Sequence, residues 1–343
     1  MRLLVASGAD VRALLGYAEC ADAMRAALID LETGRAQQPL RTVLRPDGAA
    51  GLVALMPSYL ADTADGDSAD NAESKGAPMS AYGLKAICVT PANPAAGLDT
   101  HQGIVLLSGG RHGEPLAVLN ASAVTEIRTA AVSAVATDAL ARPDADVVAI
   151  IGTGVQGQAH AVALSRTRTL REIRMTGRDQ AKAEHVVVGL VDLLSVPVWA
   201  CPSAAEAVAG AGIVVTATSS ATPVLDGQWL APGTHVNAVG ACLPATRELD
   251  TTAMAAGVLF ADSRESLLAE SGDYLIAAKD SAVGPDHVRA ELGEVLAGRA
   301  QGRINDTEIT IFESLGLAVE DLAAAACAYE RAVATGAGNW VDF

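Results

Sequence analysis

The first third of the chain begins with a helical pattern of apolar residues and continues with short strand-like runs. Apolar residues from Val11 to Leu31 recur three and four positions apart, which predicts a helix over 10–34 with Gly34 as its stop. Residues 61–78 are polar and acidic and are expected to form a surface loop. Strand-like runs occur at 41–44, 51–56, 82–89, 103–107 and 116–119. They predict a mixed or antiparallel sheet, followed by a helix over 122–140.

From residue 147 onward, apolar strands alternate with helical segments. The expected strands are 147–151, 172–176, 196–201, 213–217, 235–238 and 258–261, and the expected helices between them are 158–165, 180–194 and 204–209. Strands alternating with helices imply right-handed crossovers and a parallel sheet. We therefore predict the α/β class, with a Rossmann-type doubly wound parallel sheet. A last Ala-rich helix is expected over 317–334.

Composition narrows the function. Hydrophobic residues make up 50% of the 343 positions but aromatic residues only 3%, so a core of Ala, Val, Leu and Ile is expected. The formal charge of −16 disfavours nucleic-acid and membrane-surface partners. No apolar run reaches 18 residues, and Asp10 and Arg12 interrupt the start of the chain, so we expect a cytoplasmic protein. Five scattered cysteines lack metal-site spacing, and no metal is predicted.

A glycine motif follows the strand at 147–151. It is Gly152, Thr153, Gly154, Val155, Gln156 and Gly157. A GxGxxG turn between a buried strand and a helix lets the backbone approach a pyrophosphate at the helix N-terminus. The motif predicts a dinucleotide site, and the absence of GK[ST] excludes a P-loop.

The residue after the second strand of this unit bears on the choice of nucleotide. Enzymes that use NAD place Asp or Glu there to bind the ribose 2′-hydroxyl, whereas this chain has Arg178. A guanidinium can pair with a 2′-phosphate, so we predict NADPH, with NADH as the alternative. A solvated Arg178 paired with Asp179 is the competing interpretation.

Four further segments carry a family resemblance. Residues 83–103, 126–140, 236–250 and 309–325, arranged around the glycine motif, resemble the ornithine cyclodeaminase/μ-crystallin family. The resemblance implies a Rossmann dinucleotide-binding domain over 126–314. It also implies a second α+β substrate-binding and dimerisation domain over 1–125, to which the C-terminal helix at 315–343 returns. The expected assembly is a homodimer.

The resemblance also implies a substrate site. Matching motifs place Arg41, Lys85 and Arg128 on the substrate carboxylate. Independently, Lys85 interrupts an apolar strand, where an unpaired ammonium is costly, so it must face a cleft or meet an anion. The competing interpretation makes these residues strand-edge or surface cations. We expect them to converge opposite the nicotinamide with no carboxylate among them, which would lower the pKa of Lys85 and make it a proton donor.

One departure from the family pattern selects among its reactions. Cyclodeaminases and related alanine dehydrogenases carry an Asp where this chain has Cys242. The ketimine reductase branch resembling μ-crystallin lacks that acid and shares His101. We therefore predict NAD(P)H-dependent reduction of an α-imino acid or a cyclic ketimine carboxylate to an amino acid. Thr90, His101 and Cys242 are further expected site residues, with Ser314 and Gly316 beside the nicotinamide.

Three alternatives remain open from the sequence. The first is an ornithine or lysine cyclodeaminase, or an amino-acid dehydrogenase, that uses NAD. The second is an enzyme that joins or splits N-substituted amino acids. The third is a non-catalytic protein that binds NADPH or a small ligand.

Overall fold

The computed structural model describes residues 2–62 and 80–343, apart from the side chain of Pro94. The loop expected at 61–78 therefore lies almost entirely outside the described residues. The chain divides into two compact units, Met1–Thr125 with Leu317–Phe343, and Glu126–Gly316. We call them the first and the second unit. Within the described residues, no helix has the length and apolar character needed to cross a membrane.

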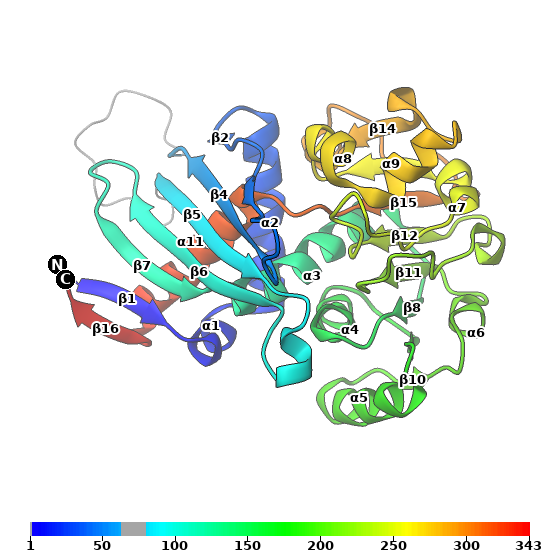
Figure 1. Ribbon diagram of the computed structural model, residues 1–343, viewed down its shortest axis with the longest axis horizontal. Helices are drawn as coiled ribbons and strands as arrows, with labels where there is room; N and C mark the ends of the chain where they lie inside the picture. Colours follow the sequence, from blue (N-terminus) through cyan, green and yellow to red (C-terminus); the bar gives the residue numbers. More distant parts are fainter. Residues whose placement is uncertain (1, 63–79) are drawn as a thin grey trace. The chain divides into compact units, whose positions relative to one another are not determined.

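The first unit is a mixed sheet with helices packed on one face (Figure 1). Its elements are β1 Arg2–Ala6, α1 Gly8–Leu14, α2 Tyr17–Glu32, β2 Ala36–Gln37, β3 Thr42–Leu44, β4 Leu52–Leu60, β5 Ala81–Val89, β6 His101–Gly109, β7 Pro115–Asn120, α11 Ala318–Thr335 and β16 Asn339–Asp342. The sheet order is β16-β1-β7-β6-β5-β4-β2, and β3 pairs with β4. The run from β4 to β7 is antiparallel, whereas β1 and β7 are parallel, which confirms the predicted mixed sheet.

The two faces of this sheet differ because strand side chains alternate. The positions of β4 and β5 that face α11 are buried, and Gly83 on β5 leaves room for Leu322 of α11. The opposite face is apolar but partly exposed. Its apolar residues include Val53, Leu55, Tyr59, Tyr82, Leu84, Ile104, Leu106 and Val118. Cross-strand partners on this face include Leu84 with Leu106, and the rings of Tyr59 and Tyr82 lie 4.9 Å apart.

The structure differs from the prediction in the first helix and at both ends of the chain. The single helix expected over 10–34 is two helices, since Gly16 adopts an extended conformation and starts α2 as its N-cap. A residue without a side chain is a poor helix former, and the break turns the chain between the two helices. The sequence reading also missed the terminal strands β1 and β16, which pair with each other. Short terminal strands have too little periodicity to be recognised alone.

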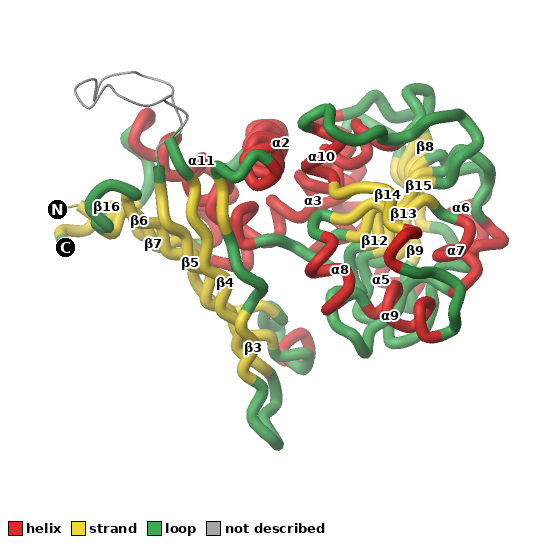
Figure 2. The backbone as a smooth tube through the Cα atoms, turned by 90° about the horizontal axis from the view of Figure 1, so that it is seen from above, coloured by secondary structure: helices red, strands yellow, loops and turns green. Residues whose placement is uncertain are grey.

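The second unit is a doubly wound parallel sheet with helices around it (Figure 2). The helix α3 Ala121–Leu140 begins in the first unit and continues into the second. The other elements of the second unit are β8 Val147–Ile151, α4 Val155–Thr167, β9 Glu172–Thr176, α5 Gln180–Leu193, β10 Val198–Ala200, α6 Ala204–Val208, β11 Ile213–Thr216, β12 His235–Ala238, α7 Thr251–Ala256, β13 Val258–Ala261, α8 Arg264–Glu270, α9 Gly272–Lys279, β14 Val288–Glu291, α10 Leu292–Leu296 and β15 Thr310–Glu313. The strand order is β10-β9-β8-β11-β12-β15-β13-β14, and the pairings between these described strands are parallel. The order reverses between β8 and β11, where ligands of such sheets bind.

This arrangement confirms the predicted Rossmann-type sheet, but one inner strand was missed. The strand β15 lies between β12 and β13, although it comes last of the unit's strands in the chain. Its four residues follow a polar loop and were noticed only as a family signature. The helices α7 to α10 and the strand β14 were also absent from the prediction. Short elements at the edge of a sheet carry weak patterns.

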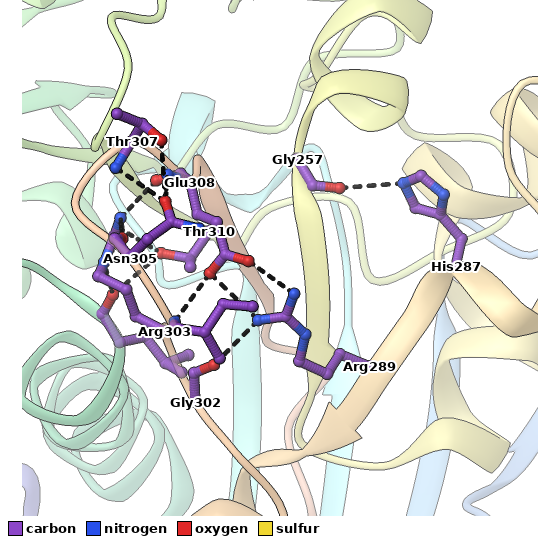
Figure 3. A network of polar contacts seen from close by, with 11 residues as sticks. Gly257, His287, Arg289, Gly302, Arg303, Asn305, Thr307, Glu308 and Thr310 are labelled. Atoms are coloured by element: carbon purple, nitrogen blue, oxygen red, sulfur yellow. Dashed lines mark hydrogen bonds and ion pairs between the residues drawn. The ribbon is translucent and has the colours of Figure 1, made fainter.

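A network of hydrogen bonds and ion pairs lies at the edge of this sheet where the strands β13, β14 and β15 begin (Figure 3). Arg289 makes two hydrogen bonds to the carboxylate of Glu308, at 2.7 and 3.1 Å. Arg303 donates to the hydroxyl of Thr310 at 3.0 Å, and His287 lies 3.0 Å from the carbonyl oxygen of Gly257. Arg289 and Arg303 anchor the loop before β15, and His287 binds the backbone before β13, all at the edge opposite the glycine turn. We assign them a structural role.

Candidate active site and dinucleotide-binding turn

The glycine turn after β8 has the geometry of a dinucleotide site. Gly152 has a φ of +131°, and a Cβ atom there would lie 2.3 Å from the carbonyl oxygen of Ala217 after β11. A Cβ atom at Gly157 would lie 1.9 Å from the carbonyl oxygen of Gly152. These two glycines are required by the protein's own backbone. Gly154 is different, because a Cβ atom there would meet no described atom within 4 Å.

The start of α4 fits an anionic ligand. Gly154 is the N-cap of this helix, and no described side chain caps it. Amide groups at an uncapped helix N-terminus, together with the helix dipole, favour a phosphate. Thr153 is buried, whereas Val155 in the first turn is 52% exposed. The open space at Gly154 and the uncapped amides fit a pyrophosphate.

Arg178 lies where the sequence predicted, directly after β9 and before α5. Its side chain is exposed. The neighbouring Asp179 caps α5 instead, since its carboxylate accepts the amide hydrogen of Lys182 at 3.1 Å. Arg178 therefore lies at the carboxyl end of β9, the edge of such sheets at which ligands bind.

Buried carboxylates hold the loops at the carboxyl ends of the strands. The two oxygens of Glu248 accept the amide hydrogens of Thr218 and Gly240, each at 2.6 Å, which links the loops after β11 and β12. Asp262, after β13, accepts the amide hydrogen of Gly316 at 2.6 Å. The sequence reading missed both residues. Each carboxylate accepts hydrogen bonds from loop amides that would otherwise be buried without an acceptor.

Two further buried carboxyl groups belong to the same region. One oxygen of Asp273 accepts the amide hydrogens of Glu248 and Leu249 at 2.8 and 2.9 Å, and Glu313 accepts the hydroxyl hydrogen of Ser271 at 2.9 Å. Burial raises the pKa of Asp273 to about 7. Burial, and then the nearby charge of Asp273, raise the pKa of Glu313 well above its usual value. The pair therefore retains a proton at mildly acidic pH.

The raised pKa of Asp273 predicts a stability change with pH. The folded-state pKa of Asp273 is raised, so its contribution is complete below the unfolded pKa near 4 and is lost as the pH rises through 7. Between pH 6.5 and 8 this group should remove about 1 kcal/mol from the free energy of unfolding. Asp273→Asn keeps an acceptor oxygen for the two amides. We expect its melting temperature to vary less with pH over this range.

The control for this measurement is Asp286→Asn, which changes an exposed carboxylate of the same unit. The buried His160 and His235 have pKa values lowered by burial to about 4 and about 3. Their contribution is lost as the pH falls below 6.5, outside the chosen window. An Asp273→Asn profile parallel to that of the native protein would contradict the raised pKa of Asp273.

Arg128 on α3 is 5% exposed and lies against the backbone of Gly316. Gly316 has a φ of +82°, and a Cβ atom there would lie 2.8 Å from a terminal nitrogen of Arg128. A side chain at position 316 would therefore be strained and would displace the guanidinium. Together with Asp262, which binds the Gly316 amide, this glycine fixes the place of Arg128 within the second unit.

Lys85 on β5 is paired with a carboxylate that the sequence reading did not anticipate. Its ammonium nitrogen lies 2.6 Å from an oxygen of Asp321 on α11, and the side chains are only 4% and 1% exposed. The expectation of a cationic set with no carboxylate was therefore wrong for Lys85. The second possibility given for a lysine in an apolar strand, that it meets an anion, is the one observed. The signal available was the pair Glu320 and Asp321 within an apolar helix.

Residues 1–336 match the model of the "Ornithine cyclodeaminase/mu-crystallin family". The chain belongs to this family. The predicted family resemblance is thereby confirmed.

Relatives in this family are similar over nearly the whole chain. A Delta(1)-pyrroline-2-carboxylate reductase of Bacillus thuringiensis subsp. konkukian is 36% identical, and the matched region covers 99% of this chain and 100% of the relative. The ketimine reductase mu-crystallin of Mus musculus is 37% identical, over 87% of this chain and 86% of its own. The structure of Thermococcus litoralis Delta(1)-pyrroline-2-carboxylate reductase with NADH and L-proline has a TM-score of 0.89 at 34% identity, over 98% and 99% of the two chains.

The other residues that the family resemblance singled out lie in both units. In the first unit, Arg41 is half-buried just before β3, Thr90 follows β5, and His101 is exposed at the start of β6. In the second unit, Cys242 is half-buried in the loop after β12. Ser314 follows β15, and its buried hydroxyl has no hydrogen-bond partner among the described residues. That hydroxyl could bind a polar group of a ligand at this edge.

Proposed function

We propose that this protein is an NAD(P)H-dependent reductase of a cyclic imino acid, with Δ1-pyrroline-2-carboxylate as the first candidate substrate and proline as its product. The observation that carries the proposal is the buried ion pair of Lys85 and Asp321, because it holds a proton-donating ammonium in an apolar interior. The similarity to reductases of this substrate over nearly the whole chain supports it.

The chemistry requires a hydride for the C=N carbon and a proton for the nitrogen. A bound reduced nicotinamide supplies the hydride. We assign the substrate carboxylate to Arg41 and Arg128, since guanidinium groups bind carboxylates in a fixed orientation. Lys85 donates the proton to the nitrogen as the C–H bond forms.

Cys242 supports reduction over deamination. A cyclodeaminase or an alanine dehydrogenase of this family is expected to use an acid at this position, and a thiol is a far weaker acid than a carboxyl group. The direct test follows the loss of NADPH absorbance with Δ1-pyrroline-2-carboxylate and identifies proline by mass spectrometry. Tight binding of NADPH without turnover would contradict the proposal, as would release of ammonia from ornithine without net use of NAD.

We propose NADPH as the preferred nucleotide because Arg178 can pair with a 2′-phosphate. Arg178→Ala should weaken NADPH binding about tenfold, the value of one charge-assisted hydrogen bond, and leave NADH binding within about twofold. Titration of nucleotide fluorescence measures both. Arg171→Ala, an exposed arginine at the other end of the same strand, serves as control and should change neither. Equal weakening of both nucleotides by Arg178→Ala would contradict a phosphate contact.

We also propose a homodimer formed through the exposed apolar face of the first unit's sheet. Leu55, Tyr82 and Ile104 on this face are 41%, 51% and 46% exposed. A contiguous apolar face of this kind is typical of a protein interface. Light scattering should give twice the mass of the chain, and a monomeric mass at micromolar concentration would contradict the proposal.

A further inference from the structure

Asp321 is held in place by the first turn of α11. The hydroxyl of Ser58 on β4 donates to the carbonyl oxygen of Ala318 at 3.1 Å, and the amide of Val319 donates to the side-chain oxygen of Gln38 at 2.9 Å. The carboxylate of Glu320 accepts the amide hydrogen of Leu317 at 3.3 Å. These hydrogen bonds tie the first turn of α11 to β4 and to the residue after β2, which restricts the movement of Asp321.

Asp321 is a charged group in direct contact with Lys85. The register neighbours of Lys85 are Met56 on β4 and Val105 on β6, and neither can ionise. From α11, Asp321 contacts the ammonium, whereas Glu320 binds the Leu317 amide. In an apolar interior an opposite charge at 2.6 Å strongly favours the ammonium form of a lysine.

We propose that Asp321 is a positioning residue for Lys85, which orients the ammonium and keeps it protonated for donation to the substrate nitrogen. This inference rests on the proposed function. One N–H of the ammonium is directed at Asp321, and this contact restricts the rotation of the ammonium. Without the carboxylate, a buried lysine would favour the neutral amine and could not donate.

The proton balance of the step is simple. The N–H bond of Lys85 breaks as the N–H bond of the product amine forms, and hydride from the reduced nicotinamide completes the C–H bond. Lys85 is then a neutral amine beside an anionic Asp321. The negative charge favours return of a proton from water, so that the next cycle begins from the ammonium.

The main test compares the pH dependence of kcat in the native enzyme and in Asp321→Asn. The basic limb of the profile should move to lower pH by at least about one unit, and kcat at pH 8 should fall at least about tenfold. The KM for NADPH should stay within about twofold, because the pyrophosphate is assigned to the glycine turn, and Asp321 has no part in that turn. Glu330→Gln, an exposed carboxylate on the same helix, is the control and should leave the profile unchanged.

Asp321→Glu keeps the charge but moves it by one methylene. We expect this variant to retain the native basic limb while its kcat falls at least about fivefold, because the ammonium is displaced. If Asp321→Asn fails to fold, Asp321→Glu still tests the positioning role of Asp321. Native kcat in Asp321→Glu, or a native basic limb in a folded Asp321→Asn, would overturn the inference. A native enzyme that oxidises no NADPH with Δ1-pyrroline-2-carboxylate would instead refute the proposed function.

Discussion

Replacing Lys85 by Met is expected to lower kcat for Δ1-pyrroline-2-carboxylate about 10³-fold. The reason is the loss of the proton donor, since a positioned general acid contributes about 10²- to 10⁴-fold to a rate. Met is close to Lys in length and fills the same buried space between β5 and α11. The dissociation constant for NADPH should remain within about twofold. Single-turnover oxidation of bound NADPH measures the chemical step directly.

The control for this variant addresses stability. Lys85→Met alone leaves Asp321 buried without its cation, which costs about 3–5 kcal/mol in the free energy of unfolding. The double variant Lys85→Met with Asp321→Asn removes both charges and should regain most of this stability while its kcat stays low. Activity within about tenfold of native in a folded Lys85→Met protein would remove Lys85 from the mechanism.

Gly154→Ala is expected to weaken NADPH binding about 100-fold without destabilising the protein. The φ of Gly154 is −77°, which an alanine adopts, and a Cβ atom there meets no described atom within 4 Å. The added methyl group would occupy the space that a pyrophosphate needs at the start of α4. A 100-fold change corresponds to about 2.7 kcal/mol of binding free energy. Fluorescence titration measures the affinity, and thermal melting without nucleotide measures the stability.

Gly189→Ala is the matched control for this site. Gly189 lies within α5, and a Cβ atom there also meets no described atom within 4 Å. An alanine in the helix should raise stability by up to about 1 kcal/mol and leave NADPH binding unchanged. If Gly154→Ala binds NADPH with native affinity, the pyrophosphate does not pass over the glycine turn.

The family relationship and the nucleotide turn could be predicted because their signals are local. The motif from Gly152 to Gly157 depends on neighbouring residues, and a buried strand before it is recognised by its apolar run. Within the second unit the structure agrees, since Gly152 and Gly157 are required by backbone contacts and Gly154 is left open. The strand β15 escaped prediction because its four residues have little pattern of their own, and only its neighbours β12 and β13 make it an inner strand.

The charges around the candidate site could not be predicted in the same way. Asp321 lies 236 residues after Lys85 in the sequence, and only the packing of α11 on β5 brings the two together. The same holds for Glu248, which binds amides after two different strands. An acidic residue in an apolar helix signals a buried charge but does not reveal its partner.

The α/β class, the glycine turn, the family and the choice of Lys85, Arg128 and Arg178 as candidate site residues could be predicted from the sequence, because each depends on a short contiguous segment of the chain. The tertiary structure alone decided that Lys85 has an acidic partner and that buried carboxylates hold the loops at the carboxyl ends of the strands. The physical reason is that a buried charge is stable only beside its counter-charge or hydrogen-bond partners, and these come from distant parts of the chain.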